Sequence, residues 1–276
     1  MFLLQTEVQD NLEKGLEQYR PFAAEACPNP VFCLRIADNT PNMDEYVQEM
    51  HQEDEGQSIN AGHIGNSPCF EFWLGQKRAS VLVTNSDYTR GSVSLESYRQ
   101  FGLNNAIMVM YALATSGLRT ALFHSSVVSH EGRGYMFLGQ SGTGKSTHSG
   151  LWLKHIAGTE LVNDDNPVVR VLDDGSVWVY GSPWSGKTPC YRNVSVPIGA
   201  IVRLSQAPYN KIRPLRGVEA YAALVPSISG KRWDKEQAEG LHETENLLAQ
   251  RVSVWHLECL PDEAAAQLCK TTCADD

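Results

Sequence analysis

The spacing of hydrophobic and polar residues predicts a strand-rich first third of the chain. Residues 31–37, 69–74 and 80–84 are short apolar or β-branched runs that end at polar or glycine-containing segments. Each run is typical of a β-strand. Residues 38–67 are rich in Asn, Asp, Glu, Gln and Gly, so we expect an exposed excursion there, with the carboxylates of residues 53–55 on a solvated face.

A long helix is predicted over residues 95–117. Aromatic, aliphatic and methionine side chains recur there at the three- and four-residue spacing of a broad buried helix face, and Gly117 is a suitable end. From Ala121 the pattern changes to short strands and tight turns. We therefore expect a β-rich N-terminal region over residues 1–95 and a second domain over residues 96–276.

The second domain is predicted to combine short strands with a few helices. Asp174-Gly175, between two strand-like runs, indicates a hairpin. Because the first two strands are joined by a tight turn and not by a helix, we expect a mixed or antiparallel sheet in an α/β fold. Strands are expected at 123–129, 134–138, 160–163, 168–172, 177–180, 199–204 and 252–257, and helices at 144–157, 217–224, 235–250 and after Pro261.

Residues 139–147 carry the pattern GxxxxGK[ST], between the strand predicted to end at Leu138 and the helix that follows. Glycines let backbone N–H groups turn inward, and a helix N-terminus adds partial positive charge, so this segment predicts a nest for phosphate. Lys145 would reach the terminal phosphates, and the Ser146 hydroxyl would ligate Mg²⁺. The expected nucleotide-binding residues are Gly139, Gln140, Ser141, Gly142, Thr143, Gly144, Lys145, Ser146 and Thr147.

An acidic pair, Asp164 and Asp165, follows a short apolar strand downstream of this loop. One carboxylate in this place can hold Mg²⁺, and the other can accept a proton from an attacking hydroxyl. The alternative is a plain turn before Pro167. Residues 181–187 are rich in turn formers and end in Lys187, which is consistent either with a lid over phosphates or with a surface turn.

The composition excludes several classes of function. The net charge of −9 argues against nucleic acid as a partner. No apolar stretch approaches the ~20 residues of a membrane span, and the N-terminus lacks the pattern of a secretory signal. The seven cysteines are irregularly spaced without a CxxC pair, so we expect a cytoplasmic protein with free thiols, including Cys269 and Cys273 on a frayed C-terminal helix.

Residues 120–205 resemble the HPr kinase/phosphorylase family and, more distantly, the ATP-dependent phosphoenolpyruvate carboxykinases. The resemblance rests on His124-Ser-Ser-Val-Val before the phosphate loop, on Leu161-Val-Asn-Asp-Asp165, and on Val196-Pro-Ile-Gly-Ala-Ile-Val. It implies the P-loop fold of these proteins, with mixed or antiparallel sheets. The sequence departs from the family at Thr147, where the family has glutamate, and at Asn193, where it has an acidic metal ligand.

The resemblance also implies roles for individual residues. His124 would lie in the active site, and Asp165 would be the base that deprotonates a seryl hydroxyl. Lys145 would contact phosphate, and Ser146 would hold Mg²⁺. Beyond the resemblance, we expect Asp164 to position the metal together with Ser146. We also expect His124 and Lys187 to stabilise the phosphate or the acceptor.

The resulting hypothesis is an ATP-dependent kinase whose acceptor is a serine-like hydroxyl of a protein, a peptide or a small molecule. Two alternatives stay open, a carboxykinase-like phosphotransferase and a non-catalytic nucleotide-sensing protein. The N-terminal region would supply either acceptor specificity or a subunit contact in a homo-oligomer.

Overall fold

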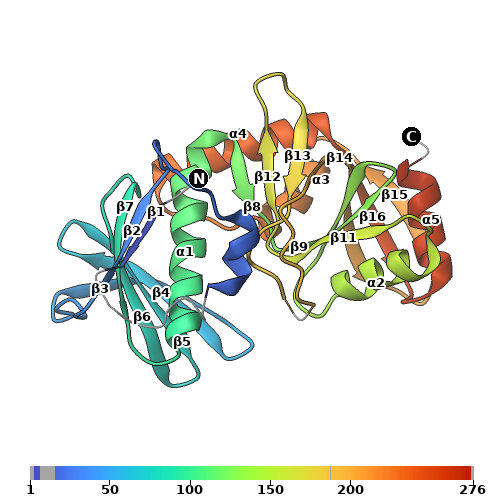
Figure 1. The fold of residues 1–276 in the computed structure, drawn as a ribbon. Helices are drawn as coiled ribbons and strands as arrows, with labels where there is room; N and C mark the ends of the chain where they lie inside the picture. The colour runs from blue at the N-terminus through green and yellow to red at the C-terminus, as the bar shows by residue number, and fades with distance from the viewer. Residues whose placement is uncertain (1–2, 7–15, 187, 275–276) are drawn as a thin grey trace. The chain divides into compact units, whose positions relative to one another are not determined.

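The structure is a computed structural model that describes residues 3–6, 16–186 and 188–274. The chain forms two compact units, Met1–Thr115 and Ser116–Asp276 (Figure 1). The long helix predicted over residues 95–117 is present as α1 (Arg99–Thr115) and belongs to the first unit. The expected domain boundary at residues 95 and 96 thus lies before this helix, and the division between the compact units lies after it.

The first unit is a seven-stranded mixed sheet with the strand order β1-β2-β7-β6-β5-β4-β3. Strands β1, β2 and β7 are parallel neighbours, and the remaining neighbours are antiparallel. The strands are β1 (Leu3–Thr6), β2 (Cys33–Ala37), β3 (Tyr46–Asp54), β4 (Gln57–Ile64), β5 (Ser67–Leu74), β6 (Lys77–Thr84) and β7 (Arg90–Leu95), and a 3-10 helix, η2, spans Glu17–Phe22.

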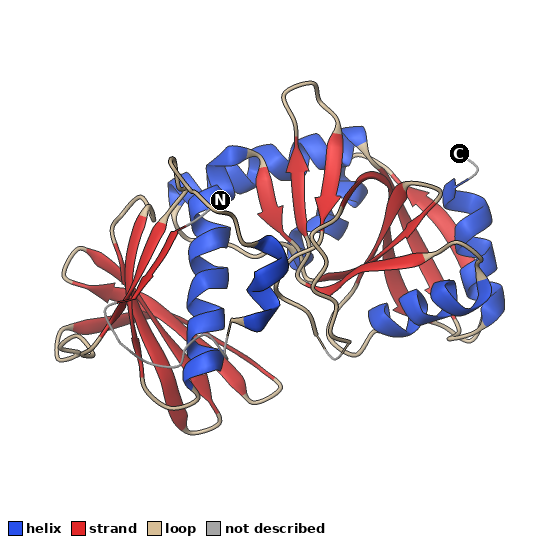
Figure 2. Cartoon of the chain, in the orientation of Figure 1, coloured by secondary structure: helices blue, strands red, loops and turns tan. Residues whose placement is uncertain are grey.

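Helix α1 covers one face of this sheet (Figure 2). Phe70, Leu82 and Val93 are direct partners on three neighbouring strands, and all three are buried. Gly102 of α1 allows close packing, because a Cβ atom at this position would lie 2.8 Å from the carbonyl oxygen of Ala79 on β6. The apolar stripe predicted for this helix is therefore core, as its spacing indicated.

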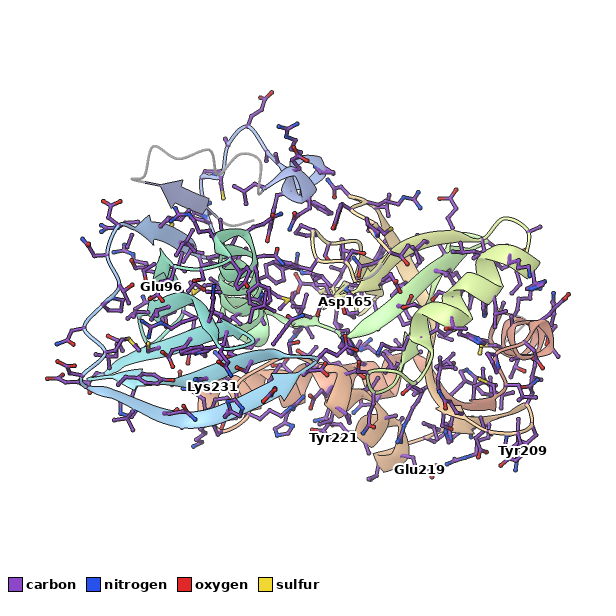
Figure 3. The ribbon with its side chains drawn as sticks, turned by 90° about the horizontal axis from the view of Figure 1, so that it is seen from below. Glu96, Asp165, Tyr209, Glu219, Tyr221 and Lys231 are labelled. Carbon is purple, nitrogen blue, oxygen red and sulfur yellow. The ribbon has the colours of Figure 1, made fainter. Side chains whose placement is uncertain are left out.

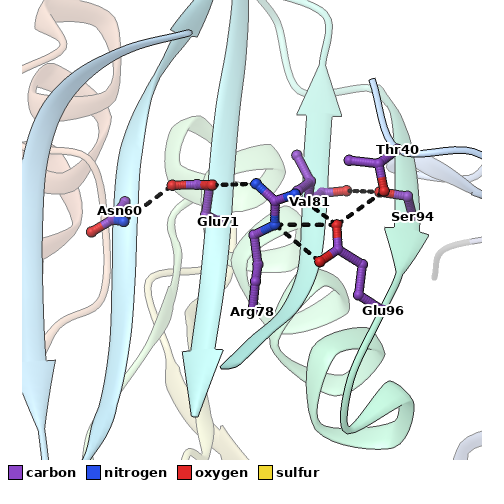
Figure 4. Close-up of polar contacts among 7 residues, drawn as sticks. All are labelled: Thr40, Asn60, Glu71, Arg78, Val81, Ser94 and Glu96. Atoms are coloured by element: carbon purple, nitrogen blue, oxygen red, sulfur yellow. Dashed lines mark hydrogen bonds and ion pairs between the residues drawn. The ribbon is translucent and has the colours of Figure 1, made fainter. Parts of the chain in front are cut away.

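A chain of polar contacts crosses strands β4 to β7 of the same sheet (Figure 4). The Arg78 guanidinium forms ion pairs with Glu71, at 2.7 Å, and with Glu96, at 2.8 Å. Glu71 is nearly buried and also accepts a hydrogen bond of 3.1 Å from the Asn60 amide. The ion pair and the hydrogen bond offset the desolvation cost of the Glu71 carboxylate. This explains how a charged group can be buried in the first unit.

The expected excursion over residues 38–67 is wrong, because most of it forms the hairpin of β3 and β4. Strand β3 lies at the sheet edge, and nearly all of its side chains are exposed. It pairs through backbone hydrogen bonds and buries no apolar face, so its sequence lacks the alternation of apolar and polar residues that predicts a strand. The turn places Glu55 and Gly56 at positive φ. The carboxylates of residues 53–55 are exposed, as expected.

The second unit contains a mixed sheet with the order β11-β9-β10-β14-β13-β12-β8, and β16 and β15 continue from β14. The α/β class and the mixed sheet are thus confirmed. The strands are β8 (Thr120–Leu122), β9 (Ser125–His130), β10 (Arg133–Leu138), β11 (Glu160–Asp165), β12 (Val168–Val171), β13 (Val177–Tyr180), β14 (Ser195–Gln206), β15 (Lys211–Leu215) and β16 (Ser253–Cys259). The helices are η3 (Ser116–Leu118), α2 (Lys145–His155), α3 (Val218–Leu224), η4 (Val225–Ser227), α4 (Lys235–Arg251) and α5 (Glu263–Ala274).

Two apolar clusters pack on opposite faces of the sheet. Trp152 of α2 and Cys269 of α5 pack with Phe137 of β10 on one face. Leu224 of α3 and Leu248 of α4 belong to the cluster on the other face, together with Met136, Ile201 and Val254. The expectation that Cys269 and Cys273 lie on a frayed helix end is wrong, because both are buried in this core, although both thiols are free, as expected.

Strands β10, β14 and β16 run parallel to one another, so their carboxyl ends meet at one edge of the sheet. Open α/β sheets bind ligands at such an edge. The strand β9 is antiparallel to β10 and begins at the same edge. Among the residues that the structure describes, no helix is long and apolar enough to cross a membrane.

Candidate active site

The segment 139–144 forms a tight loop between the end of β10 at Leu138 and the start of α2 at Lys145. Gly142 and Gly144 have φ of 77° and 109°, a backbone conformation that residues with a side chain rarely adopt. The loop is closed by a hydrogen bond from the Thr143 N–H to the Gln140 carbonyl oxygen, at 3.1 Å. The strand, loop and helix therefore follow one another as the sequence predicted.

Lys145 begins α2 and directs its ammonium group back over the loop. Its Nζ atom donates to the carbonyl oxygens of Gly139, at 3.0 Å, and of Gln140, at 3.3 Å. The same atom lies 2.9 Å from Nε2 of His124. The positive charge is thus concentrated at the mouth of the loop, in an otherwise acidic chain.

His124 links this lysine to Asp165. Its Nδ1 atom lies 3.1 Å from Oδ1 of Asp165. Because an ammonium group can only donate, Nε2 of His124 accepts in its contact with Lys145, which leaves the ring proton on Nδ1, the atom nearer the carboxylate. Lys145, His124 and Asp165 therefore form one chain of polar contacts, and the His124 and Asp165 side chains are 42% and 31% exposed, so a substrate can reach them.

The backbone around His124 is fixed from two sides. The His124 N–H donates to the Ser227 carbonyl oxygen at 2.6 Å, and Phe123 forms a β-bridge with Ile228. On the other side, Ser125 pairs directly with Asp165, which places the histidine beside the carboxylate. Figure 3 labels Asp165 in the second unit.

The segment that carries Ser227 is itself held by a buried charged cluster. Arg232 donates to the Val225 carbonyl oxygen at 3.0 Å and to the fully buried Glu245 carboxylate at 2.6 Å. Tyr221 donates to the other Glu245 oxygen at 2.7 Å. Burial, and then the charge of Glu245, raises the pKa of Tyr221 to about 12, so its hydroxyl stays protonated and donating.

Asp164 differs sharply from its neighbour. It is buried, with 4% of its surface exposed, and neither carboxylate oxygen has a hydrogen-bond partner among the described residues. Its pairing partner on β9 is Ser126, whose hydroxyl lies 2.6 Å from that of Ser149 on α2. A buried carboxylate without partners is costly, so this position favours a cation.

This orphaned carboxylate fits the expected magnesium site. Ser146 lies in the first turn of α2 and is exposed, so its hydroxyl is available as the second protein ligand. No group of three or more His, Cys, Asp or Glu residues suited to a metal occurs in the described part of the chain. Mg²⁺ usually takes one or two protein ligands and completes its shell with phosphate oxygens and water, so the small set fits this ion.

The turn-rich segment 181–186 packs beside the acidic pair. The Asn163 amide donates to the Ser182 hydroxyl and to the Trp184 carbonyl oxygen, both at 3.1 Å. Ser185 forms a β-bridge with Asp165, and the Gly186 N–H donates to the Asp164 carbonyl oxygen at 2.8 Å. The described part of the segment is thus paired to the sheet edge, and Lys187 lies outside the described residues.

No role was predicted from the sequence for two further residues at the site, Ser125 and Gln206. The Ser125 hydroxyl is completely buried and has no hydrogen-bond partner among the described residues, although it lies between the strand of the loop and that of Asp165. Gln206, the last residue of β14, donates to the Gly142 carbonyl oxygen at 3.2 Å and so attaches β14 to the loop tip. The segment His124-Ser-Ser-Val-Val included Ser125 without indicating its burial, and nothing in the sequence indicated Gln206, because its partner Gly142 is 64 residues away.

Comparison with known proteins gives a distant likeness among solved structures. A scan of known protein families and a search of curated proteins find no match for this chain. Among solved structures, the chain is similar to the Hpr(Ser) kinase/phosphatase from Coxiella burnetii. The identity is 11%, the match covers 56% of this chain and 94% of that one, and the TM-score is 0.33.

Proposed function

We propose that the second unit is an ATP-dependent kinase that transfers a phosphoryl group to a hydroxyl group. The observation that carries the proposal is the chain of polar contacts from Lys145 through His124 to Asp165 at the mouth of the glycine loop. It brings a cation for phosphate and a carboxylate for proton transfer to one place. Phosphoryl transfer needs little more than these groups, well positioned.

The loop would bind the triphosphate of ATP through its inward N–H groups, and Lys145 would neutralise charge on the terminal phosphate. Asp165 would take the proton of the incoming hydroxyl as its oxygen attacks the γ-phosphorus, while the bond to the leaving oxygen of ADP breaks. A positioned base of this kind contributes about 10²–10⁴-fold to the rate.

His124 would act on Asp165 and not directly on the acceptor. Its Nδ1 atom lies 3.1 Å from Oδ1 of Asp165, so the imidazole would orient the carboxylate toward an acceptor. Asp164 and Ser146 would hold Mg²⁺, which supplies charge neutralisation of the phosphate oxygens. The acceptor class that suits a carboxylate base is an alcohol, such as a serine-like hydroxyl.

The proposal is tested with γ-labelled ATP and Mg²⁺ against a panel of peptides, proteins and small alcohols. Label should move to one acceptor class with the wild-type protein, and Asp165→Asn should retain ATP binding but lose most of the transfer. Arg170→Ala is the matched control, because this exposed arginine of β12 has no hydrogen bond or ion pair among the described residues.

Two outcomes would replace the proposal. Tight ATP binding without transfer to any acceptor would favour a nucleotide sensor. Release of CO₂ from oxaloacetate in the presence of ATP would favour a carboxykinase-like reaction.

A further inference from the structure

One row of directly paired residues crosses six strands at the edge of the second unit's sheet. Successive partners are Arg213 and His256, then Arg203, and then Leu138, which directly precedes the glycine loop. The row continues through Ser125 to Asp165. Directly paired residues present their side chains on the same face of a sheet, so both ends of this row face one side.

The glycine loop begins in the middle of this row. Asp165 lies two strands from Leu138 on one side, and Arg203 lies one strand from it on the other, with neighbouring strands about 4.8 Å apart. His124 and Lys145 contact each other on the Asp165 side. The terminal phosphate and the acceptor therefore belong to that side, and the rest of a nucleotide must extend elsewhere.

On the opposite side, Arg203 is an exposed cation without a hydrogen bond or an ion pair among the described residues. Its row neighbour His256 has its Nε2 atom 2.8 Å from the Ser205 hydroxyl. Burial first, and then the charge of Arg203, lowers the pKa of His256. The other arginine of the row, Arg213, is already engaged through both Nη atoms with Glu219, at 3.0 and 3.2 Å.

Two acidic groups face this cluster and both have partners. Glu219 pairs with Arg213, and Glu258 accepts a hydrogen bond of 3.1 Å from the Tyr209 hydroxyl. Neither is paired to Arg203. The guanidinium of Arg203 can therefore bind an added anion without first losing a carboxylate partner.

Strand β14 is also attached to the loop. Gln206 lies three residues after Arg203 on this strand, with its side chain on the opposite face, and donates to the Gly142 carbonyl oxygen, so the carboxyl end of β14 adjoins the loop tip. An anion held by the loop N–H groups is thus close to the end of β14. Arginine matches phosphate oxygens well, because its planar fork donates two parallel hydrogen bonds.

We propose that Arg203 binds the α-phosphate of the nucleotide, so that the nucleoside extends over the carboxyl ends of β14 and β16, away from Asp165. This inference rests on the proposed nucleotide site and adds the direction in which the nucleotide lies. In this orientation the loops that follow β14 and β16 would contact the nucleoside.

The test is calorimetric titration of Mg-ADP and Mg-ATP into the full-length wild type, Arg203→Ala, Arg203→Lys and the control Arg170→Ala. Arg203→Ala should weaken both nucleotides by the same factor, about tenfold or more, since both carry the α-phosphate. Arg203→Lys should recover part of the affinity, and Arg170→Ala should bind as the wild type does. Thermal unfolding verifies that the variants are folded.

Equal affinities of Arg203→Ala and wild type for both nucleotides would overturn the inference and leave the proposed function standing. A loss confined to ATP would place Arg203 at the γ-phosphate and would also overturn it. A wild type that binds neither nucleotide would instead refute the proposed function, and this inference with it.

Discussion

At the scale of the residue, Asp164 and Asp165 are adjacent in sequence but have opposite surroundings. Asp165 is partly exposed and lies 3.1 Å from a ring nitrogen of His124, whereas Asp164 is buried and both of its oxygens are without partners in the described structure. This contrast suits a division of labour between proton transfer and cation binding. The sequence indicated that the pair matters, but the contrast depends on burial by α2 and on the segment 181–186.

Asp164→Asn removes the buried charge while keeping the side-chain shape. We expect the free energy of unfolding without Mg²⁺ to rise by about 1 kcal/mol or more, because desolvation of an unpaired carboxylate is relieved. The stabilisation that Mg-ATP gives to the wild type should fall strongly in the variant. Denaturant unfolding with and without Mg-ATP measures both effects, and a variant that is less stable without Mg²⁺ but keeps the full Mg-ATP effect would contradict the role given to Asp164.

His148 provides a pH-dependent contribution to stability. It is buried on α2, its Nε2 accepts a hydrogen bond of 3.2 Å from Trp152 Nε1, and burial lowers its pKa to about 4. Below about pH 6.5 the unfolded chain binds a proton there and the folded chain does not, so stability is full above pH 6.5 and is lost as the pH falls toward 4. The loss attributable to this residue is about 3 kcal/mol.

His148→Gln, whose amide oxygen can still accept from Trp152, should flatten the decline of stability between pH 6.5 and 4. Urea unfolding at several pH values measures this, with His51→Gln on the exposed edge of the first unit as the control. An unchanged pH profile in His148→Gln would show that other groups cause the acid sensitivity.

At the scale of the element, the sequence predicted those elements whose formation depends on residues nearby in the chain. The hairpin of β9 and β10, the glycine loop and α2 follow one another within a short stretch, and the sequence predicted each of them. The pairing of β14 with β10 and β16, which places Arg203 opposite Leu138 and Gln206 at the loop tip, joins distant segments and left no local signal. Strand β3 was missed because an exposed edge strand needs no apolar alternation.

Two glycine substitutions test the packing of elements around the site. A Cβ atom on Gly186 would lie 2.8 Å from the Asp164 carbonyl oxygen, so Gly186→Ala should separate the segment from β11 and cost about 1–3 kcal/mol. Gly150, inside α2, has open space around its Cβ position, so Gly150→Ala should stabilise by about 0.5–1 kcal/mol.

Transfer activity should fall in Gly186→Ala, because the neighbouring acidic pair is displaced, and should be unchanged in Gly150→Ala. Thermal unfolding and the labelled-ATP assay measure the two effects. Full activity in a destabilised Gly186→Ala would show that the segment does not position the acidic pair.

At the scale of the whole molecule, every described residue of the candidate site lies in the unit Ser116–Asp276. The resemblance noted in the sequence is also confined to that unit. No motif in the sequence indicates a function for the first unit, in which helix α1 covers the sheet. What the sequence could predict of function therefore concerns the second unit alone.

A chain of residues 116–276 should fold by itself and bind Mg-ATP with an affinity close to that of the full chain, since it contains its own core and all candidate ligands. Circular dichroism and calorimetry of this fragment test the expectation, with residues 1–115 as the control that should not bind. A folded fragment that fails to bind would mean that the first unit contributes to the nucleotide site.

The most direct test of the account is calorimetric titration of Mg-ATP into the full-length wild type and into Lys145→Ala. The account predicts a measurable heat of association for the wild type and a loss of about tenfold or more in affinity when the ammonium group is removed. No association with the wild type, or equal affinity in Lys145→Ala, would contradict the claim that this loop and lysine bind the triphosphate.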